Sequence, residues 1–198
     1  MEKLLKIPYN VFNDWNQLLQ FLERKGNPRY ELIGYVNFYE RKDIFDLGNL
    51  VRVYGDLDLY NSSIQSLGNL EYVDGDLDLG ETQIKSLRNL VRVEGSLMLQ
   101  DTPIESLGNL EYVGGNLNIY KLSIQSLGNL EYVGNNLELT NTPIESLGNL
   151  KYVGNHLALD DTPIKTLKNL EYVGGKIFIN GNHQIPKEQL TKFKIKYI

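Results

Sequence analysis

Cysteine is absent from the 198-residue chain, so disulfide bonds and thiolate metal sites are excluded. Long apolar runs are absent too, and none approaches the ~20 residues that a bilayer-spanning helix needs. The opening sequence, MEKLLKIPYN, lacks the apolar segment of a signal peptide. These absences predict a soluble cytoplasmic protein that has no membrane partner.

The chain also lacks a surplus of basic residues. It holds 20 Lys and Arg against 25 Asp and Glu, which gives a formal net charge of -5. A nucleic-acid binder needs a basic face to release phosphate counterions, so we expect no nucleic-acid partner. The hydrophobic content of 41% argues against disorder, and the length is compatible with one domain.

Motifs that carry chemistry are missing as well. The chain has two histidines, of which His156 falls on an outward strand position and His183 in an irregular last turn. We find no Ser-His-Asp arrangement, no phosphate loop and no histidine cluster with metal-ligand spacing. The sequence therefore predicts a protein that is not an enzyme and that needs no cofactor and no metal.

A 20-residue repeat dominates what is present. Its common text is L-G-N-L-E-Y-V-G-G-x-L-x-L-x-x-T-x-I-x-S, and seven copies begin at Leu47, Leu67, Leu87, Leu107, Leu127, Leu147 and Leu167. A degenerate coil precedes them, in which residues 32–38 match the V-x-G-x-L-x-L core with a shift of one residue. The pair Leu57 and Leu59 alternates with polar residues in every copy, which predicts half-buried strands that pair as one parallel ladder.

The remaining columns of the repeat each predict a local structure. Leu50, Val53, Ile64 and Leu67 should point inward with the strand pair. One coil buries too little to fold alone, so stability belongs to the stacked array. The column at the start of each strand predicts a tight turn with left-handed backbone, since it holds only Gly or Asn: Gly55, Gly75, Gly95, Gly115, Asn135, Asn155 and Gly175.

Two polar columns hardly vary between coils, and we expect their side chains to satisfy backbone groups in the turns. A binding ladder is the alternative interpretation, although a binding face should vary from coil to coil. The Asn column comprises Asn49, Asn69, Asn89, Asn109, Asn129, Asn149 and Asn169, and the hydroxyl column comprises Ser66, Ser86, Ser106, Ser126, Ser146 and Thr166.

The motif L-x-L-x-x-T-x-I-x-x-L resembles the leucine-rich repeat, with Thr82, Thr102, Thr142 and Thr162 in the slot of the family's asparagine. Ser62 and Leu122 fill that slot in two other coils, and Asn182 restores the family residue in the last. The N-L-E-Y-V-G-G-x-L half is also similar to the coils of receptor L domains. The resemblance implies a right-handed solenoid of about eight coils that serves as a recognition scaffold.

The chain divides into a repeat solenoid and two caps. We expect an N-terminal cap at 1–29, a solenoid at 30–185 with a degenerate first coil at 30–46 and regular coils from 47, and a C-terminal cap at 186–198. Residues 11–25 predict an amphipathic helix that Asn13 or Asp14 caps and that Gly26 and Pro28 end. Its apolar residues follow helical spacing: Trp15, Leu18, Leu19 and Leu22.

The cap helix is expected to lie on the first coil, and a docking helix for a partner is the alternative. At the other end, Pro186 predicts a short helix through Leu190. The alternation of Phe193, Ile195 and Tyr197 with lysines predicts a closing strand whose charges discourage further pairing. A basic contact site or a dimer edge is the alternative for this strand.

The outward strand positions vary between coils, so they are the candidate partner-binding residues. Tyr, Met and Phe on such a face are residue types that anchor interfaces. The candidates are Asp56, Asp58, Tyr60, Asp76, Asp78, Met98, Tyr120, Glu138, His156, Asp160 and Phe178.

Four aspartates stand on neighbouring strands: Asp56, Asp58, Asp76 and Asp78. Like charges opposite each other on a sheet repel. A basic surface on a partner protein, or a bound cation such as Ca²⁺, would offset the repulsion. Carboxylates that simply extend into water are the third interpretation.

In a further column, here called the tyrosine column, Arg52 and Arg92 flank Tyr72, which suits cation–π stacking. The column comprises Arg52, Tyr72, Arg92, Tyr112, Tyr132, Tyr152 and Tyr172. We expect it to stabilise lateral packing, and a second interaction surface is the alternative. Taken together, the sequence predicts a protein-binding scaffold of unknown oligomeric state, with inhibition of a basic target as its sharper form. A ligand- or cation-binding module and a self-assembling structural protein are the alternatives.

Overall fold

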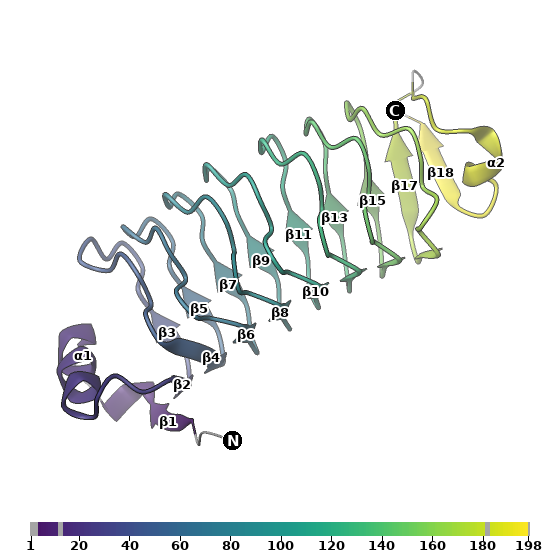
Figure 1. Ribbon diagram of the computed structural model, residues 1–198. Helices are drawn as coiled ribbons and strands as arrows, with labels where there is room; N and C mark the ends of the chain where they lie inside the picture. The colour runs from purple at the N-terminus through teal and green to yellow at the C-terminus, as the bar shows by residue number, and fades with distance from the viewer. Residues whose placement is uncertain (1–3, 12–13, 181–182, 198) are drawn as a thin grey trace.

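The repeats form an elongated stack of coils with a parallel β-sheet on each of two sides (Figure 1). The computed structural model describes residues 4–11, 14–180 and 183–197. Each 20-residue coil gives one strand to each sheet, and equivalent residues pair in register, as Leu57 does with Leu77. A β-solenoid of about eight coils, as predicted, is therefore confirmed.

The first sheet carries the tyrosine column and has nine strands. In spatial order they are β1 (Leu5–Pro8), β2 (Tyr30–Ile33), β4 (Leu50–Tyr54), β6 (Tyr72–Val73), β8 (Arg92–Val93), β10 (Tyr112–Val113), β12 (Tyr132–Val133), β14 (Tyr152–Val153) and β16 (Tyr172–Val173).

The second sheet carries the L-x-L pairs and also has nine strands. They are β3 (Val36–Asn37), β5 (Leu57–Asp58), β7 (Leu77–Asp78), β9 (Leu97–Met98), β11 (Leu117–Asn118), β13 (Leu137–Glu138), β15 (Leu157–Ala158), β17 (Lys176–Ile179) and β18 (Lys194–Tyr197). The degenerate coil pairs Val36 with Leu57, which confirms its shift of one residue.

The prediction of one parallel sheet was therefore incomplete, because a second sheet runs along the tyrosine column. Most of its strands are two residues long, as in the pair Tyr132 and Val133. Such a strand buries one apolar residue, Val133, whereas the L-x-L pair of the second sheet buries two at alternate positions, Leu137 and Leu139, and so shows the period-two pattern by which strands are recognised.

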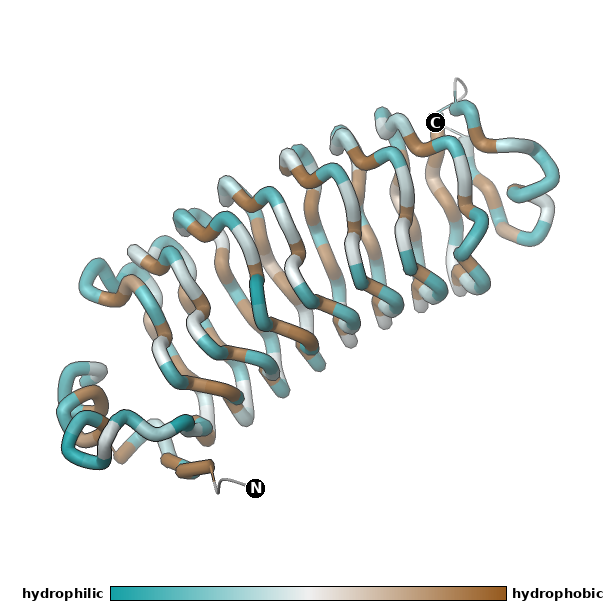
Figure 2. The backbone as a smooth tube through the Cα atoms, viewed as in Figure 1, coloured by the Kyte–Doolittle hydropathy of each residue, from teal (hydrophilic) through white to brown (hydrophobic). Residues whose placement is uncertain are grey.

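A continuous core fills the space between the sheets. Leu50, Val53, Leu57, Ile64 and Leu67 are all at most 1% exposed, which confirms the inward columns. Figure 2 shows hydrophobic positions recurring at the same place in successive coils. Because each coil packs against the next, the core extends from the N-terminal cap to the C-terminal cap.

Left-handed backbone occurs in a different column from the one expected. Gly55 has a φ of +147°, but the other glycines at the strand start have no positive φ. Glycine is needed there because of space: a Cβ on Gly75 would overlap Oδ1 of Asp56, and one on Gly115 would lie 2.5 Å from Oγ of Ser96. The left-handed glycines are those of the Leu-Gly-Asn motif, such as Gly48, with a φ of +59°.

The hydroxyl column serves the backbone throughout, as predicted, and in the Asn column the side chains of Asn49, Asn89 and Asn169 do so. Oγ of Ser106 accepts a bond of 3.0 Å from the N–H of Gly108, and the other hydroxyls of its column act in the same way. Nδ2 of Asn89 donates to the carbonyl of Gly68 at 3.1 Å. In the threonine slot, Oγ1 of Thr82 donates to the carbonyl of Leu79 at 2.7 Å.

The tyrosine column stacks along the first sheet, as predicted. The ring centroids of Tyr112, Tyr132, Tyr152 and Tyr172 follow one another at 4.5, 4.5 and 4.7 Å. The guanidinium of Arg92 lies 3.4 Å from the ring centre of Tyr112, so this arginine stacks on Tyr112 where Tyr72 was expected. The guanidinium of Arg52 does lie over Tyr72, at 5.6 Å.

The N-terminal cap contains β1, the 3-10 turn η1 (Tyr9–Val11) and the helix α1 (Trp15–Arg24). Oδ1 of Asp14 caps the helix by accepting from the N–H of Gln17 at 2.8 Å, while Asn13 lies outside the described residues. Trp15, Leu18 and Leu22 are buried, and the Trp15 ring meets Phe38 of the first coil. Leu19 is 43% exposed, so its expected place in the buried stripe was wrong.

The C-terminal cap comprises the short helix α2 (Lys187–Leu190), which follows Pro186, and β18. β18 pairs parallel to β17, which confirms the predicted closing strand. Oε1 of Gln189 accepts from the N–H of Leu167 at 2.7 Å and thereby covers the last coil. Neither helix in the described part of the chain is long and apolar enough to cross a membrane.

Candidate binding surface on the second sheet

The outward side of the second sheet, here called the strand face, carries all eleven candidate residues. The first outward column forms a ladder of side-chain acceptors that connects successive coils. Oδ1 of Asp56 accepts from the N–H of Asp76 at 2.8 Å, and Oδ1 of Asp76 accepts from the N–H of Ser96 at 2.6 Å.

The same ladder continues through the later coils. Oγ of Ser96 accepts from the N–H of Asn116, and the amide oxygens of Asn116 and Asn136 accept from Asn136 and His156. Nδ1 of His156 accepts from the N–H of Lys176 at 2.9 Å. The neutral imidazole therefore carries its proton on Nε2. Six different acceptor side chains thus perform one structural task, which column variability alone did not reveal.

Side chains of the second outward column accept hydrogen bonds from backbone groups of their own coil. Oδ1 of Asp58 accepts from the N–H of Tyr60 at 3.0 Å, and Oδ1 of Asp78 accepts from the N–H of Gly80 at 2.8 Å. Oε1 of Glu138 makes the equivalent bond to the N–H of Thr140 at 2.9 Å. Burial raises the pKa of the Asp78 carboxyl, the bond from Gly80 lowers it, and the charge of Asp58 raises it.

The four-aspartate cluster therefore has internal hydrogen-bond partners, which offset part of the repulsion that the sequence indicated. Oδ2 of Asp58 also accepts from the Tyr35 hydroxyl at 3.2 Å. Within residues 4–11, 14–180 and 183–197, no three His, Asp or Glu side chains are grouped to hold a metal ion. The arrangement favours a structural role for Asp56 and Asp76 over contact with a basic partner surface or with a bound cation.

The aromatic candidates lie apart along the strand face. Tyr60 stacks on Tyr39 with ring centroids 5.5 Å apart, and its hydroxyl donates to Glu81. This hydrogen bond raises the pKa of Tyr60 to about 12. Tyr120 is 41% exposed, and Met98 is half-buried on β9. These residues present apolar surface at separate points and do not form one cluster.

Four candidates do come together, at a hollow over β13, β15 and β17. This strand-face hollow has a volume of about 430 Å³ and is bordered by Glu138, Thr140, His156, Ala158, Asp160 and Phe178. The register places Ala158 between Glu138 and Phe178 on adjacent strands. The hollow exists because a single methyl group separates two long side chains.

Phe178 forms the aromatic side of the hollow. Its ring meets the imidazole of His156 edge-on, with centroids 5.3 Å apart and planes at 82°. Nζ of Lys196 lies 5.4 Å from the centre of the same ring. Phe178 therefore contacts one side chain of the preceding coil and one of the C-terminal cap.

Asp160 forms the acidic side together with Glu138. Asp160 is only 8% exposed, and its Oδ1 is buried with no hydrogen-bond partner among the described residues. Burial raises the pKa of the Asp160 carboxyl, as do the charges of Glu138 and Asp161, while the backbone N–H of Asp160 lowers it. A buried acceptor atom without a hydrogen bond costs free energy, so Oδ1 of Asp160 has unused acceptor capacity.

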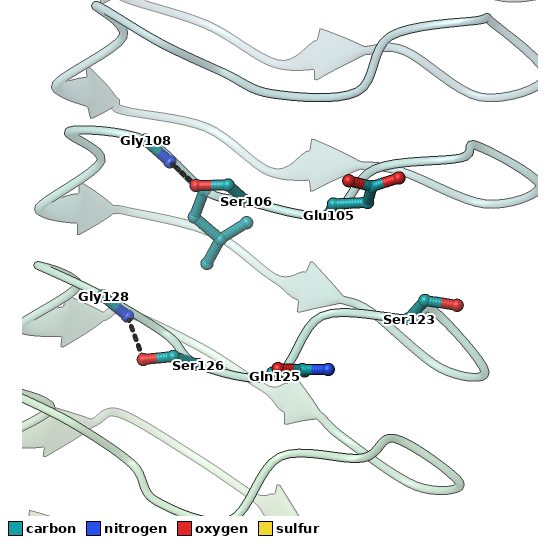
Figure 3. Close-up of a pocket in the computed structure, with 8 residues that line it drawn as sticks. Glu105, Ser106, Gly108, Ser123, Gln125, Ser126 and Gly128 are labelled. Atoms are coloured by element: carbon teal, nitrogen blue, oxygen red, sulfur yellow. Dashed lines mark hydrogen bonds between the residues drawn. The ribbon is translucent and has the colours of Figure 1, made fainter.

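A second hollow, of about 500 Å³, lies between the connecting segments of two adjacent coils (Figure 3). Two of its hydroxyls, those of Ser106 and Ser126, accept from the N–H groups of Gly108 and Gly128. Glu105 is its one ionisable side chain among the described residues. Unlike the strand-face hollow, its described lining holds no aromatic ring and no buried carboxylate oxygen without a hydrogen-bond partner.

Comparisons with protein-family models, with curated proteins and with solved structures found no match to this chain. The coil architecture is therefore established by the structure itself, through the parallel pairing of its strands.

Sequence reasoning did not single out Ala158, Thr140 or Asn136, all of which border the hollow. The signal for Ala158 was present, because it is the smallest residue in an outward column that otherwise holds Asp, Met, Asn, Glu and Phe. The burial of Asp160 had no such signal, since aspartate is a residue type that usually lies exposed.

Proposed function

We propose that this chain is a non-enzymatic scaffold that binds a partner protein through the strand face, centred on the strand-face hollow. The observation that carries the proposal is the meeting of Glu138, His156, Asp160 and Phe178 around Ala158. A pocket with an aromatic wall and a few convergent polar groups is typical of the centre of a binding surface.

The dimensions of the strand face support the proposal. Nine parallel strands have eight spacings of ~4.8 Å, which gives a face about 38 Å long. A standard interface covers about 800 Å² on each partner, and a face of this length can supply it. The scattered exposed rings, such as Tyr120, would then contact the partner at the periphery of the hollow.

The engagement of both imidazoles argues for binding rather than catalysis. Nδ1 of His156 accepts from Lys176, and Nδ1 of His183 accepts from the N–H of Ile185 at 3.2 Å. A general base needs a nitrogen within reach of a substrate proton, and these two nitrogens are already bonded to the backbone.

Two finer assignments belong to the same proposal. We assign the coils to a leucine-rich-repeat-like class because Thr82 and its equivalents bond the turn backbone from the slot of the family's asparagine. We place the scaffold in the cytoplasm because the chain has no cysteine. Because Asp56 and Asp76 accept hydrogen bonds from the backbone of the next coil, we propose that the partner contacts the strand-face hollow and not the four aspartates.

The experiment that tests the proposal is affinity capture from a host lysate with tagged protein, followed by affinity measurement on the captured partner. Ala158→Trp fills the hollow, and Gln125→Trp adds the same side chain to an exposed site on another side of the coil. We expect Ala158→Trp to weaken binding at least about ten-fold, since a blocked interface centre removes its anchors. Equal affinities for the two variants would contradict the proposal.

A further inference from the structure

We infer that the strand-face hollow receives an arginine side chain of the partner protein, with its guanidinium between Glu138 and Asp160 and its methylene stem against Ala158 and Phe178. This inference rests on the proposed function and adds the chemistry of the residue that the hollow selects.

The need for a cation comes from Asp160. Its Oδ1 is buried and accepts no hydrogen bond from any described residue, although the side chain borders the hollow. Glu138 uses Oε1 for the N–H of Thr140, and within the described chain no group donates to its Oε2. Both carboxylates belong to residues that border one space, and each has an oxygen that accepts no hydrogen bond from a described residue, so a cationic donor in that space would be attracted by both.

The intramolecular cations do not fill this role. Nζ of Lys196 is directed to the Phe178 ring, at 5.4 Å from its centre, and its residue pairs with Phe178 in the register of β17 and β18. The salt bridges within the described residues involve neither Glu138 nor Asp160. No salt-bridge partner for these two carboxylates therefore lies within the described residues.

The shape of the hollow distinguishes arginine from lysine. Ala158 and Phe178 give apolar walls for a methylene stem, and about 430 Å³ accommodates a long side chain. A guanidinium is planar and carries five donors, so it can bond two carboxylates at once and also pack against an aromatic ring. An ammonium is a more strongly hydrated point charge, and it loses more solvation in a space bordered by Phe178 and Ala158.

The test is an NMR titration of the isotope-labelled full chain with the peptide acetyl-Gly-Arg-Gly-amide. The same peptide with lysine, and with citrulline as an uncharged isostere, provides the comparison. We expect saturable shifts at the Ala158 and Phe178 amides and at the Asp160 carboxyl carbon. Arginine should bind at least about five-fold more tightly than lysine, and citrulline should not saturate.

A matched pair of variants localises the binding. Asp160→Asn removes the buried charge and should weaken arginine binding at least about ten-fold. Glu145→Gln removes a charge from an exposed residue of the same coil as Glu138 that does not border the hollow, and should leave affinity within about two-fold. Circular dichroism establishes that both variants are folded.

Equal binding of arginine and citrulline peptides, or binding that Asp160→Asn leaves unchanged, would overturn the inference. If the arginine peptide does not bind while Ala158→Trp still abolishes partner capture, the arginine inference fails and the proposed function stands. If the peptide binds as expected while Ala158→Trp has no effect on the partner, the inference about the partner's arginine fails together with the proposed function.

Discussion

The acceptor ladder gives a sharp prediction at Asp76. Its Oδ1 accepts from the N–H of Ser96 at 2.6 Å, and a hydrogen bond to a charged acceptor contributes about 1.5–3 kcal/mol when it is buried. Both groups lie near solvent, so water replaces part of a lost bond. We expect Asp76→Ala to lower the free energy of unfolding by about 1–2 kcal/mol.

Asp76→Asn is the matched control, because the amide keeps an oxygen in the position of Oδ1. Asn116 already shows that an asparagine performs this task, since its Oδ1 accepts from the N–H of Asn136 at 3.2 Å. Asp76→Asn should therefore cost less than about 0.5 kcal/mol.

Urea unfolding followed by circular dichroism measures both changes, and the Ala variant should melt about 2–8 °C lower than the native chain. A loss below about 0.3 kcal/mol for Asp76→Ala would show that the ladder does not stabilise the fold. An equal loss of unfolding free energy in Asp76→Ala and Asp76→Asn would show that the acceptor oxygen of Asp76 is not what stabilises the fold.

Three further predictions concern buried and turn positions. Thr82→Val should lower the free energy of unfolding by about 1–2 kcal/mol, because it removes a buried hydrogen bond to a carbonyl. Ser62 fills the slot of Thr82, but its buried hydroxyl has no partner. Ser62→Thr should therefore raise the free energy of unfolding in denaturant, because a threonine here can make the bond that Thr82 makes. Gly48→Ala should lower the free energy of unfolding by about 1–2 kcal/mol, because alanine disfavours the left-handed backbone at this position. Gly108→Ala should lower it clearly more in the same assay, since the added Cβ would lie 2.5 Å from the backbone of the preceding coil. Burial raises the pKa of Asp160, so the folded state holds that proton more tightly than the unfolded state does. The carboxyl's contribution to stability therefore falls as pH rises from its unfolded pKa, near 3.8, through its folded pKa. The melting temperature of Asp160→Asn relative to the native chain should rise over the same interval, and a constant difference would refute this.

The solenoid could be predicted because its signal is repeated in every coil. Each apolar column, such as the one containing Val53, occurs in all the regular coils, so the inward direction of one member fixes the others. The invariant Asn and Ser columns were also interpretable, since residues such as Ser106 bond backbone groups in the same local turn.

What could not be predicted depends on contacts between coils. The outward column of Asp56 changes residue type from coil to coil, and variability suggested a binding surface. The structure shows that Asp, Ser, Asn and His side chains all accept from the next coil's N–H, so variable residues share one role. Similarly, the acidic side of the strand-face hollow includes the buried Asp160, whose burial no column of the repeat encodes.

The ladder also has a direction and an end. Every member from Asp56 to His156 carries an atom that can accept a hydrogen bond, but Lys176, the last, has only donors on its side chain. An interior coil is bonded in the same way to the coil before it and the coil after it, so a 20-residue insertion or deletion there would restore every bond. The residues at the two ends therefore terminate the ladder without fixing the number of coils, and the interior can lengthen or shorten without a new kind of contact.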